Sequence, residues 1–102
     1  MNNLLISIAL VFLEEQDMAE IRMYMKARCP YCNLAEQMLR DNGAVEIVKV
    51  HVDHDEESEK HMKQKLGTSQ VPQFVIGERH VGGFDELAAM KHSGELKQLL
   101  AG

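Results

Sequence analysis

The chain has 102 residues, of which 45% are hydrophobic and 26% charged, and its formal net charge is −5. A chain of this length folds around one hydrophobic core, so we expect one small globular domain rather than a disordered protein. The negative charge argues against nucleic acid or an anionic membrane as a partner, and two cysteines are too few for a disulfide-stapled secreted scaffold.

The first seventeen residues differ from the rest of the chain. Leu4 to Leu13 form an apolar run of ten residues, followed by an acidic stretch over 14–17. A bilayer span needs about 20 residues, and the run lacks the basic start and the small-residue cleavage site of an export signal. We therefore expect residues 1–17 to be an apolar extension outside the domain, which covers 18–102, or Met18 to be the natural start. We expect a cytoplasmic protein with no membrane association, unless this extension is a real targeting segment.

A strand, a helix and a second strand are predicted in the first half of the domain. Apolar and polar residues alternate over 21–26, which is typical of a strand. Pro30 suits the first turn of a helix, where its missing N–H would have had no partner. Apolar residues then recur at helical spacing over 34–39, and Asn42-Gly43 ends that helix. Valines alternate with other residues over 47–52 and predict the second strand.

A second helix and a third strand follow. The stretch 53–59 is acidic and turn-like, and it leads into a charged helix whose buried face we place at Met62 and Leu66. Gly67 ends this helix. The apolar run over 71–76 predicts a third strand, with a proline near its start.

The end of the chain predicts a short strand and two short helices. Gly77-Glu78 turns the chain into a strand over 79–81, which Gly82-Gly83 breaks. Asp85 is placed to cap a helix running to about residue 90, and Ser93 to cap a last helical segment. The residues that we expect on the inner faces of these helices are Leu87, Met90, Leu96, Leu99 and Leu100.

The predicted order is β-α-β-α-β-β-α, with a final short helix. Two strands joined through a helix run parallel with a right-handed connection, whereas two strands joined by a two-residue turn form an antiparallel hairpin. The sequence therefore predicts an α/β domain with a mixed four-stranded sheet flanked by helices on both faces.

Both cysteines of the chain lie in one motif, Cys29-Pro30-Tyr31-Cys32, between the first strand and the first helix. Unpaired N–H groups and the positive end of the helix dipole stabilise a thiolate at Cys29, and Lys26 and Arg28 add positive charge. Cys32 lies one turn further along the helix, where it can attack a mixed disulfide formed on Cys29. These features predict a dithiol–disulfide exchanger.

Two other interpretations of the cysteine pair remain open from the residues alone. The pair could be half of a zinc site completed by His51 and His54, or it could be two inert buried thiols. We expect no metal, because both histidines belong to a segment that resembles a solvated turn beside Asp53 and Asp55.

Residues 18–102 resemble a glutaredoxin of the small bacterial dithiol type. Three separated motifs have that family's order and spacing: Lys26 with Cys29-Pro30-Tyr31-Cys32, then Val71-Pro72-Gln73, then His80-Val81-Gly82-Gly83-Phe84-Asp85-Glu86-Leu87. The resemblance implies a thioredoxin-like fold, reduction by glutathione, and a glutathione mixed disulfide carried by Cys29. It also implies glutathione-binding residues, namely Lys26, Tyr31, Gln70, Val71, Pro72, Gly83, Phe84 and Asp85.

Some of these residues have roles implied by the same resemblance. Pro72 is expected to follow a cis peptide bond and to present the backbone of Val71 to the extended tripeptide. Asp85 is expected to bind the ammonium group of glutathione, and Lys26 its glycine carboxylate. Tyr31 is expected to form a wall of the binding groove.

The chain also departs from the family pattern. Gln70 stands where threonine is usual, and Phe84 replaces a cysteine or serine found in many relatives. In many relatives a polar or basic residue at the position of Glu59 is a second anchor for the glycine carboxylate, beside Lys26. The acidic side chain of Glu59 does not favour this second contact. Lys60 or Lys63 is expected to be its substitute.

The predicted function is a monomeric glutathione-dependent oxidoreductase that acts on disulfide-containing or glutathionylated proteins. An alternative is a dimer that binds a [2Fe–2S] cluster through two Cys29 thiolates and two glutathiones, although Pro30 stiffens the loop and works against it. A third interpretation is a thioredoxin reduced by a flavoprotein, which the Pro-Tyr pair and the absence of tryptophan disfavour.

Overall fold

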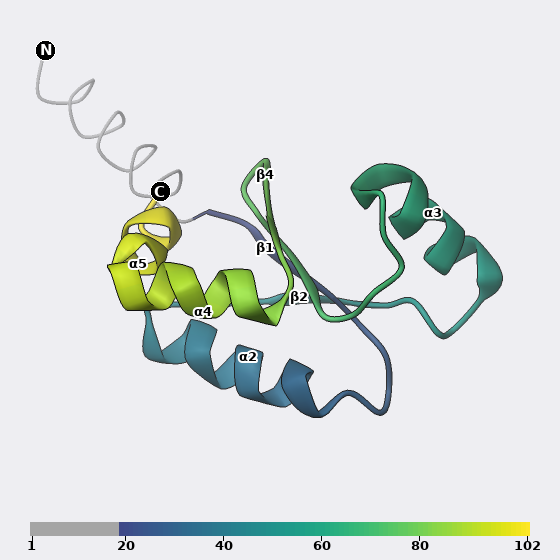
Figure 1. Ribbon diagram of the computed structural model, residues 1–102, viewed down its shortest axis with the longest axis horizontal. Coiled ribbons are helices and arrows are strands. Elements are labelled where there is room, and N and C mark those ends of the chain that lie inside the picture. Colours follow the sequence, from purple (N-terminus) through teal and green to yellow (C-terminus); the bar gives the residue numbers. More distant parts are fainter. Residues whose placement is uncertain (1–18) are drawn as a thin grey trace, which may run out of the picture.

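The computed structural model describes residues 19–102, and the predicted extension over 1–17 lies outside the described residues. Eight elements follow in chain order (Figure 1): β1 (Ile21–Met25), α2 (Pro30–Asp41), β2 (Val48–His51), α3 (Glu56–Leu66), β3 (Gln73–Ile76), β4 (Arg79–Gly82), α4 (Phe84–Ser93) and α5 (Glu95–Leu100). The predicted order of strands and helices is confirmed. Within residues 19–102, no helix has the length and apolar character that crossing a bilayer requires.

The four strands form one mixed sheet in the order β2-β1-β3-β4. β1 and β2 are parallel, with Met25 opposite His51, and α2 makes the crossover between them. β3 runs antiparallel to both β1 and β4. The parallel pair and the antiparallel hairpin are therefore those that the sequence predicts.

Helices cover both faces of the sheet. α2 and α4 lie together against one face, and α3 lies apart from them toward the other (Figure 1). The larger core lies under α2, α4 and α5 and contains Met23, Leu39, Phe74, Leu87 and Leu96; the smaller core lies under α3 and contains Tyr24, Val52, Met62 and Val75. Neighbouring residues of one strand thus face opposite cores, as the pleat of a strand requires.

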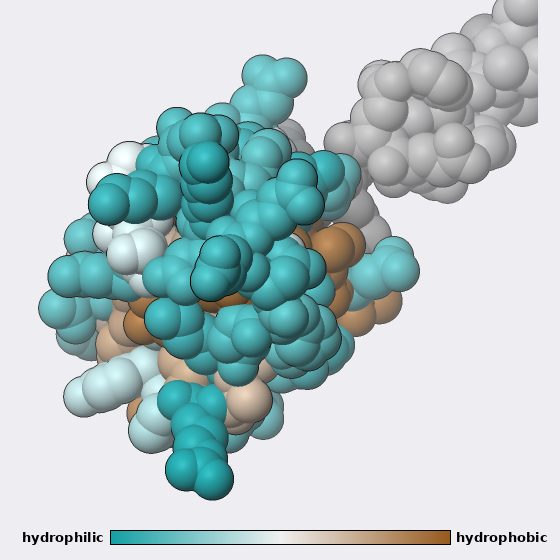
Figure 2. All heavy atoms as spheres, turned by 90° about the vertical axis from the view of Figure 1, so that its right-hand side faces the viewer, coloured by the Kyte–Doolittle hydropathy of each residue, from teal (hydrophilic) through white to brown (hydrophobic). Residues whose placement is uncertain are grey.

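The outer face of α3 is polar. Met62 is the residue of this helix that is fully buried, and it packs with Val52 in the smaller core. Seen from the side of α3, hydrophilic residues cover most of the molecular surface (Figure 2). This charged helix is held mainly by one apolar stripe, as its sequence pattern predicts.

Two predicted boundaries are wrong by a few residues. β3 begins at Gln73 rather than at residue 71, because Pro72 has no N–H to give to the sheet. α3 begins at Glu56, within the stretch that we expected to be a turn. The Asp55 carboxylate accepts a hydrogen bond from the Ser58 N–H at 2.6 Å, so it caps the helix and places the acidic residues in the favourable first turn.

The predicted caps of the last two helices also need correction. Gly83, and not Asp85, is the N-cap of α4, and the Glu86 carboxylate accepts its N–H at 3.2 Å. Gly94 is the N-cap of α5, while the Ser93 hydroxyl accepts the Glu95 N–H at 3.2 Å. Ser93 therefore still accepts a hydrogen bond from an otherwise unpaired N–H at the start of α5, although it lies one residue before the N-cap.

Candidate active site

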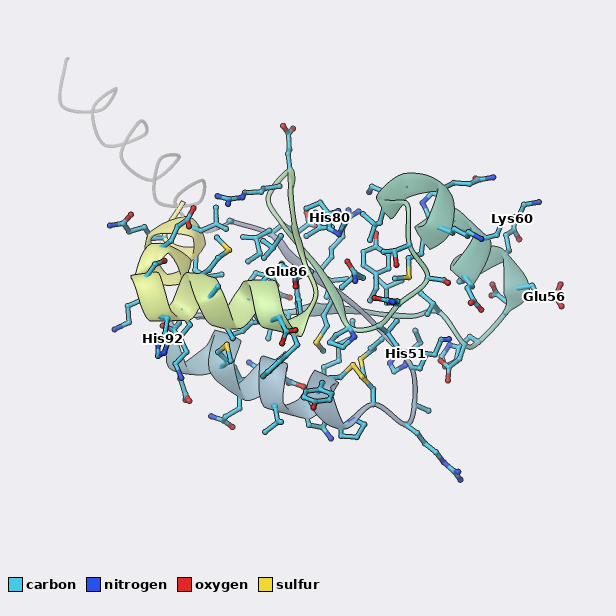
Figure 3. All side chains as sticks on the ribbon, in the orientation of Figure 1. His51, Glu56, Lys60, His80, Glu86 and His92 are labelled. Atoms are coloured by element: carbon cyan, nitrogen blue, oxygen red, sulfur yellow. A yellow bond between two sulfur atoms is a disulfide. The ribbon has the colours of Figure 1, made fainter. Side chains whose placement is uncertain are left out.

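Cys29 and Cys32 are joined by a disulfide at the start of α2 (Figure 3). Their Cα atoms are 5.2 Å apart, and the Cys32 N–H donates a hydrogen bond to the Cys29 carbonyl at 3.1 Å. Cys32 is 1% exposed, whereas Cys29 is only half-buried. The accessible sulfur is therefore that of Cys29, and the greater protection of Cys32 is confirmed.

The local backbone places Cys29 at the N-terminus of α2. Cys29 is the N-cap residue with extended backbone (φ −139°, ψ 93°), and Pro30 occupies the first helical turn. The first turn carries no acidic side chain that would neutralise the positive end of the helix dipole. An anion at the Cys29 sulfur is stabilised by this arrangement, which is the condition for a reactive thiolate.

The two basic residues before the motif are placed differently. Arg28 is exposed, while Lys26 is half-buried and its Nζ lies 3.9 Å from Oε1 of Glu59 on α3. The structure thus places Lys26, the predicted anchor for the glycine carboxylate, next to Glu59, the residue that departs from the family pattern. The positive charge of Lys26 is shared with Glu59.

A groove of about 370 Å³ opens beside the cysteine motif. Its lining comes from the motif, from the segment before and at the start of β3, and from the start of α4: Tyr31, Gln70, Val71, Pro72, Gln73, Gly83, Phe84, Asp85 and Glu86. Every residue that the resemblance implies for glutathione is in this lining except Lys26. Gln73 and Glu86 also line the groove; both belong to the sequence motifs but were not among the predicted site residues.

The floor of the groove is built at the start of β3. The Val71–Pro72 peptide bond is cis, as the resemblance implies. Gln73 is 7% exposed, and its Oε1 lies 2.8 Å from Nε2 of His80 on β4. An amide oxygen only accepts, so the His80 Nε2–H donates to it and fixes the orientation of the buried amide.

The opposite wall depends on two glycines. Gly82 has φ +118°, which side chains rarely allow, and a Cβ there would lie 3.0 Å from the Glu86 side chain. A Cβ on Gly83 would lie 3.4 Å from the Pro72 carbonyl oxygen. The start of α4 thus lies within contact distance of the cis-proline loop, and the positive φ makes Gly82 the more demanding of the two positions.

An aromatic pair joins the cysteine motif to α4. The rings of Tyr31 and Phe84 are tilted by 50° with their centroids 5.1 Å apart, a favourable geometry for aromatic side chains. Tyr31 is 55% exposed, so this contact leaves much of its ring available to a ligand. Phe84, which departs from the family pattern, thereby supports the wall that Tyr31 forms. Asp85 lies beside it in the first turn of α4 and is exposed.

The two other interpretations of the cysteine pair do not fit the geometry. The cysteines are bonded to each other and Cys29 is accessible, so they are not inert buried thiols. The proposed zinc ligands His51 and His54 do cluster, but with Asp53 rather than with the cysteines among the described residues.

Comparison with known proteins gives consistent matches. The glutaredoxin family model matches residues 21–81. A glutaredoxin of Neisseria meningitidis serogroup A is 40% identical over 83 residues, covering 81% of this chain and 98% of the relative. The solution structure of a glutaredoxin from Brucella melitensis matches with a TM-score of 0.72 at 34% identity, over 83% of this chain and 91% of that chain. A structure described as "Metal Binding of Glutaredoxins" matches with a TM-score of 0.64 at 34% identity, over the same shares of the two chains.

The match to the family model covers the cysteine motif and the cis-proline segment and ends before α4. The mixed sheet with helices on both faces is a thioredoxin-like fold, as expected. The family match, together with the disulfide-bonded pair at the start of α2, supports a thiol–disulfide oxidoreductase. Since the family model covers more than half of the chain, and a relative at 40% identity is matched over almost its whole length, the chain belongs to the glutaredoxin family.

Proposed function

We propose that this oxidoreductase depends on glutathione and reduces protein disulfides and glutathione mixed disulfides through Cys29 and Cys32. The observation that carries the proposal is the groove beside the disulfide, which combines Tyr31, the cis Val71–Pro72 bond and the start of α4. Glutaredoxins use glutathione as a substrate, and the tripeptide is an extended, charged molecule of the kind that such a groove suits.

In the proposed dithiol reaction, the Cys29 thiolate attacks one sulfur of the substrate disulfide. A mixed disulfide forms and the other substrate sulfur leaves as a thiolate, which takes up a proton. Cys32 then attacks Cys29, which releases the second substrate thiol and closes the Cys29–Cys32 disulfide. Two glutathione molecules restore the dithiol: the first attacks Cys29, and the second removes the bound glutathione as oxidised glutathione.

A glutathione mixed disulfide needs only Cys29 in this scheme. The thiolate attacks the sulfur of the glutathione moiety, so the protein substrate leaves as a free thiol. A second glutathione then releases oxidised glutathione and regenerates Cys29. The first attack requires that the groove hold the glutathione moiety next to Cys29.

The proposed groove contacts follow the charges of glutathione. The Val71 backbone pairs with the extended tripeptide, and Gln70 contributes a polar side chain at the same edge. Asp85 accepts hydrogen bonds from the ammonium group, and Gly83 and Phe84 place the start of α4 against the γ-glutamyl end. Lys26 lies outside the groove lining and reaches the glycine carboxylate only by loosening its pairing with Glu59.

A coupled assay tests this function. The purified protein is incubated with a small glutathione mixed disulfide, glutathione, NADPH and glutathione reductase, and NADPH oxidation is followed. We expect turnover that requires both glutathione and the protein. Turnover with NADPH and thioredoxin reductase in the absence of glutathione would instead show the thioredoxin-type reaction and would overturn the proposal.

Cluster binding is a second candidate function. The matched structure described as "Metal Binding of Glutaredoxins" favours it, whereas Pro30, which stiffens the loop and lacks an N–H, works against it. Anaerobic purification with glutathione, followed by visible absorption and size-exclusion measurements, separates the two. A coloured dimer supports the cluster, and a colourless monomer that is active in the coupled assay supports the enzyme alone.

We further propose that the protein works as a cytoplasmic monomer on disulfide-containing or glutathionylated proteins, and that it binds no nucleic acid. A reducing compartment suits a cysteine pair that must cycle, and the net charge of −5 disfavours nucleic acid. Light scattering on the purified full chain tests the monomer. A mass of twice the chain mass in the absence of a cluster would contradict it.

A further inference from the structure

A second group of reactive side chains lies at the carboxyl end of β2. His51 ends this strand, and Asp53 and His54 follow in the turn that leads to α3 (Figure 3). One donor atom from each of the three residues lies within 4.8 Å of the other two. The imidazole rings of His51 and His54 are nearly parallel, at 8°, with their centroids 4.9 Å apart.

The backbone of this turn is held from two sides. The Val52 N–H donates to the Met25 carbonyl at 2.9 Å, and the Val52 side chain is fully buried in the smaller core. On either side of the buried Val52, His51 is half-buried and Asp53 is exposed. The Ala27 N–H donates to Oδ2 of Asp53 at 3.0 Å and so fixes this carboxylate. The group is therefore built on an ordered turn.

The charge of the turn favours a cation. Asp53 carries a carboxylate, and its hydrogen bond from Ala27 uses Oδ2, so Oδ1 is left for a ligand. The exposed acidic residues that follow add negative potential, while Lys26 and Arg28 oppose it from the loop across the turn.

We propose that His51, Asp53 and His54 form a binding site for one borderline divalent cation such as Zn²⁺ or Ni²⁺. Imidazole nitrogens prefer such ions over Mg²⁺ and Ca²⁺, which select oxygen ligands. Three protein ligands leave one tetrahedral position for water. Donors around zinc lie roughly 3.4 Å apart at bond lengths of about 2.1 Å. The separations here are up to 4.8 Å, so ion binding requires them to shorten, by rotation of the exposed His54 and the half-buried His51 side chains.

This proposal revises the expectation that the protein binds no metal. That expectation concerned the two histidines as partners of the cysteines, in a turn expected to be solvated. The structure supplies a different third ligand, Asp53, which the Ala27 N–H orients. The proposed ligand set therefore contains neither cysteine.

The test uses the oxidised, untagged full chain, in which the disulfide removes both thiols as competing ligands. Titration calorimetry with Zn²⁺ should show one ion per chain, and the imidazole signals of His51 and His54 should shift in NMR spectra. His51→Gln and His54→Gln should each lower the affinity at least about tenfold, the loss that even an outer-shell change commonly causes. His61→Gln and His92→Gln, at two other exposed histidines, are the matched controls and should leave the affinity unchanged.

Asp53→Asn separates the ligand from its structural role. The asparagine oxygen can still accept from Ala27, so the melting temperature without metal should stay close to that of the wild type while zinc affinity falls. Zinc affinity that is unchanged in the His51 and His54 variants would overturn the proposal. Competition by Mg²⁺ at equal concentration would overturn it as well, because an oxygen-preferring ion does not select two imidazoles.

Discussion

At the scale of single residues, the two cysteines differ because the fold exposes one and buries the other. Cys29 is half-buried at the mouth of α2, and Cys32 is 1% exposed one turn inside it. The exposed sulfur can meet a substrate disulfide, whereas the buried sulfur can reach only its neighbour. This difference divides the proposed chemistry between an attacking and a resolving thiol.

Serine substitutions test this division. Cys29→Ser should abolish both the reduction of protein disulfides and the removal of glutathione from mixed disulfides, because a hydroxyl does not form the thiolate. Cys32→Ser should retain deglutathionylation and lose dithiol reduction. Parallel assays with a glutathione mixed disulfide and with a protein disulfide measure the two activities. Loss of both activities in Cys32→Ser would refute the assigned roles.

Glu59 is predicted to weaken glutathione binding by competing for Lys26. The charged atoms of the ion pair are 3.9 Å apart, and the two side chains are 38% and 45% exposed. Such a pair contributes little free energy, so its release should change glutathione binding by only a small factor. Glu59→Gln should lower the KM for glutathione by a factor of about 1.4 to 5 with kcat unchanged, since exposed pairs are worth roughly 0.2–1 kcal/mol. Glu57→Gln, on an exposed position of the same helix, is the control. A higher KM in Glu59→Gln would show that Glu59 assists binding instead.

At the scale of elements, the N-termini of three helices position the redox pair, the groove and the turn after β2. The start of α2 holds the redox pair, the start of α4 closes the groove, and the Asp55 cap fixes where the turn after β2 becomes α3. Sequence periodicity predicted that each of these helices exists. The caps depend on neighbouring segments, which is why Asp85 was wrongly expected to cap α4.

The Asp55 cap predicts how stability depends on pH. The Ser58 backbone N–H lowers the pKa of Asp55, and a carboxylate with a lowered folded pKa stabilises the protein above its unfolded pKa. That contribution is lost as the pH falls from about 4 through the lower folded value. Asp55→Ala should therefore lower the melting temperature at pH 7, and the difference from the wild type should shrink toward pH 3. Glu78→Ala, in the exposed hairpin turn, is the control and should show no such convergence.

Two glycine substitutions test the junction of β4 and α4. Gly77 and Gly82 both have positive φ, but a Cβ on Gly77 meets no atom within 4 Å, whereas one on Gly82 meets Glu86 at 3.0 Å. Gly77→Ala should cost about 1 kcal/mol through backbone strain alone. Gly82→Ala should cost more and should also reduce activity, because the start of α4 must shift. Urea unfolding measures both, and equal costs would contradict a close approach at Gly82.

At the scale of the whole molecule, one sheet separates two cores of unequal size. The larger core under α2, α4 and α5 supports the redox helix, and the smaller core under α3 supports the turn of the proposed cation site. β1 and β3 lie in the centre of the sheet and contribute side chains to both cores. The redox pair and the turn of the proposed cation site both follow the carboxyl ends of the parallel strands β1 and β2, at the same edge of the sheet.

This arrangement predicts that the described domain unfolds as one unit. Met62 and Leu39 are each fully buried, one in each core, and truncation of such side chains commonly costs about 2–5 kcal/mol. Met62→Ala and Leu39→Ala should both lower stability by that amount in a single cooperative transition. Coincident urea curves from circular dichroism and from tyrosine fluorescence check this. Two separate transitions in Met62→Ala would show that the cores are independent.

The sequence by itself determined the order of the elements, the position of the redox pair and the family to which the chain belongs. The order and the position follow from local causes, namely alternation in strands, helical spacing of apolar residues, and Pro30 and the cysteines at a helix start, whereas the family follows from the resemblance of three separated motifs. The tertiary structure alone decided which distant residues meet: Lys26 with Glu59, Tyr31 with Phe84, and Asp53 with Ala27. Such contacts depend on how the helices dock on the sheet, and periodicity along one chain carries no information about that docking.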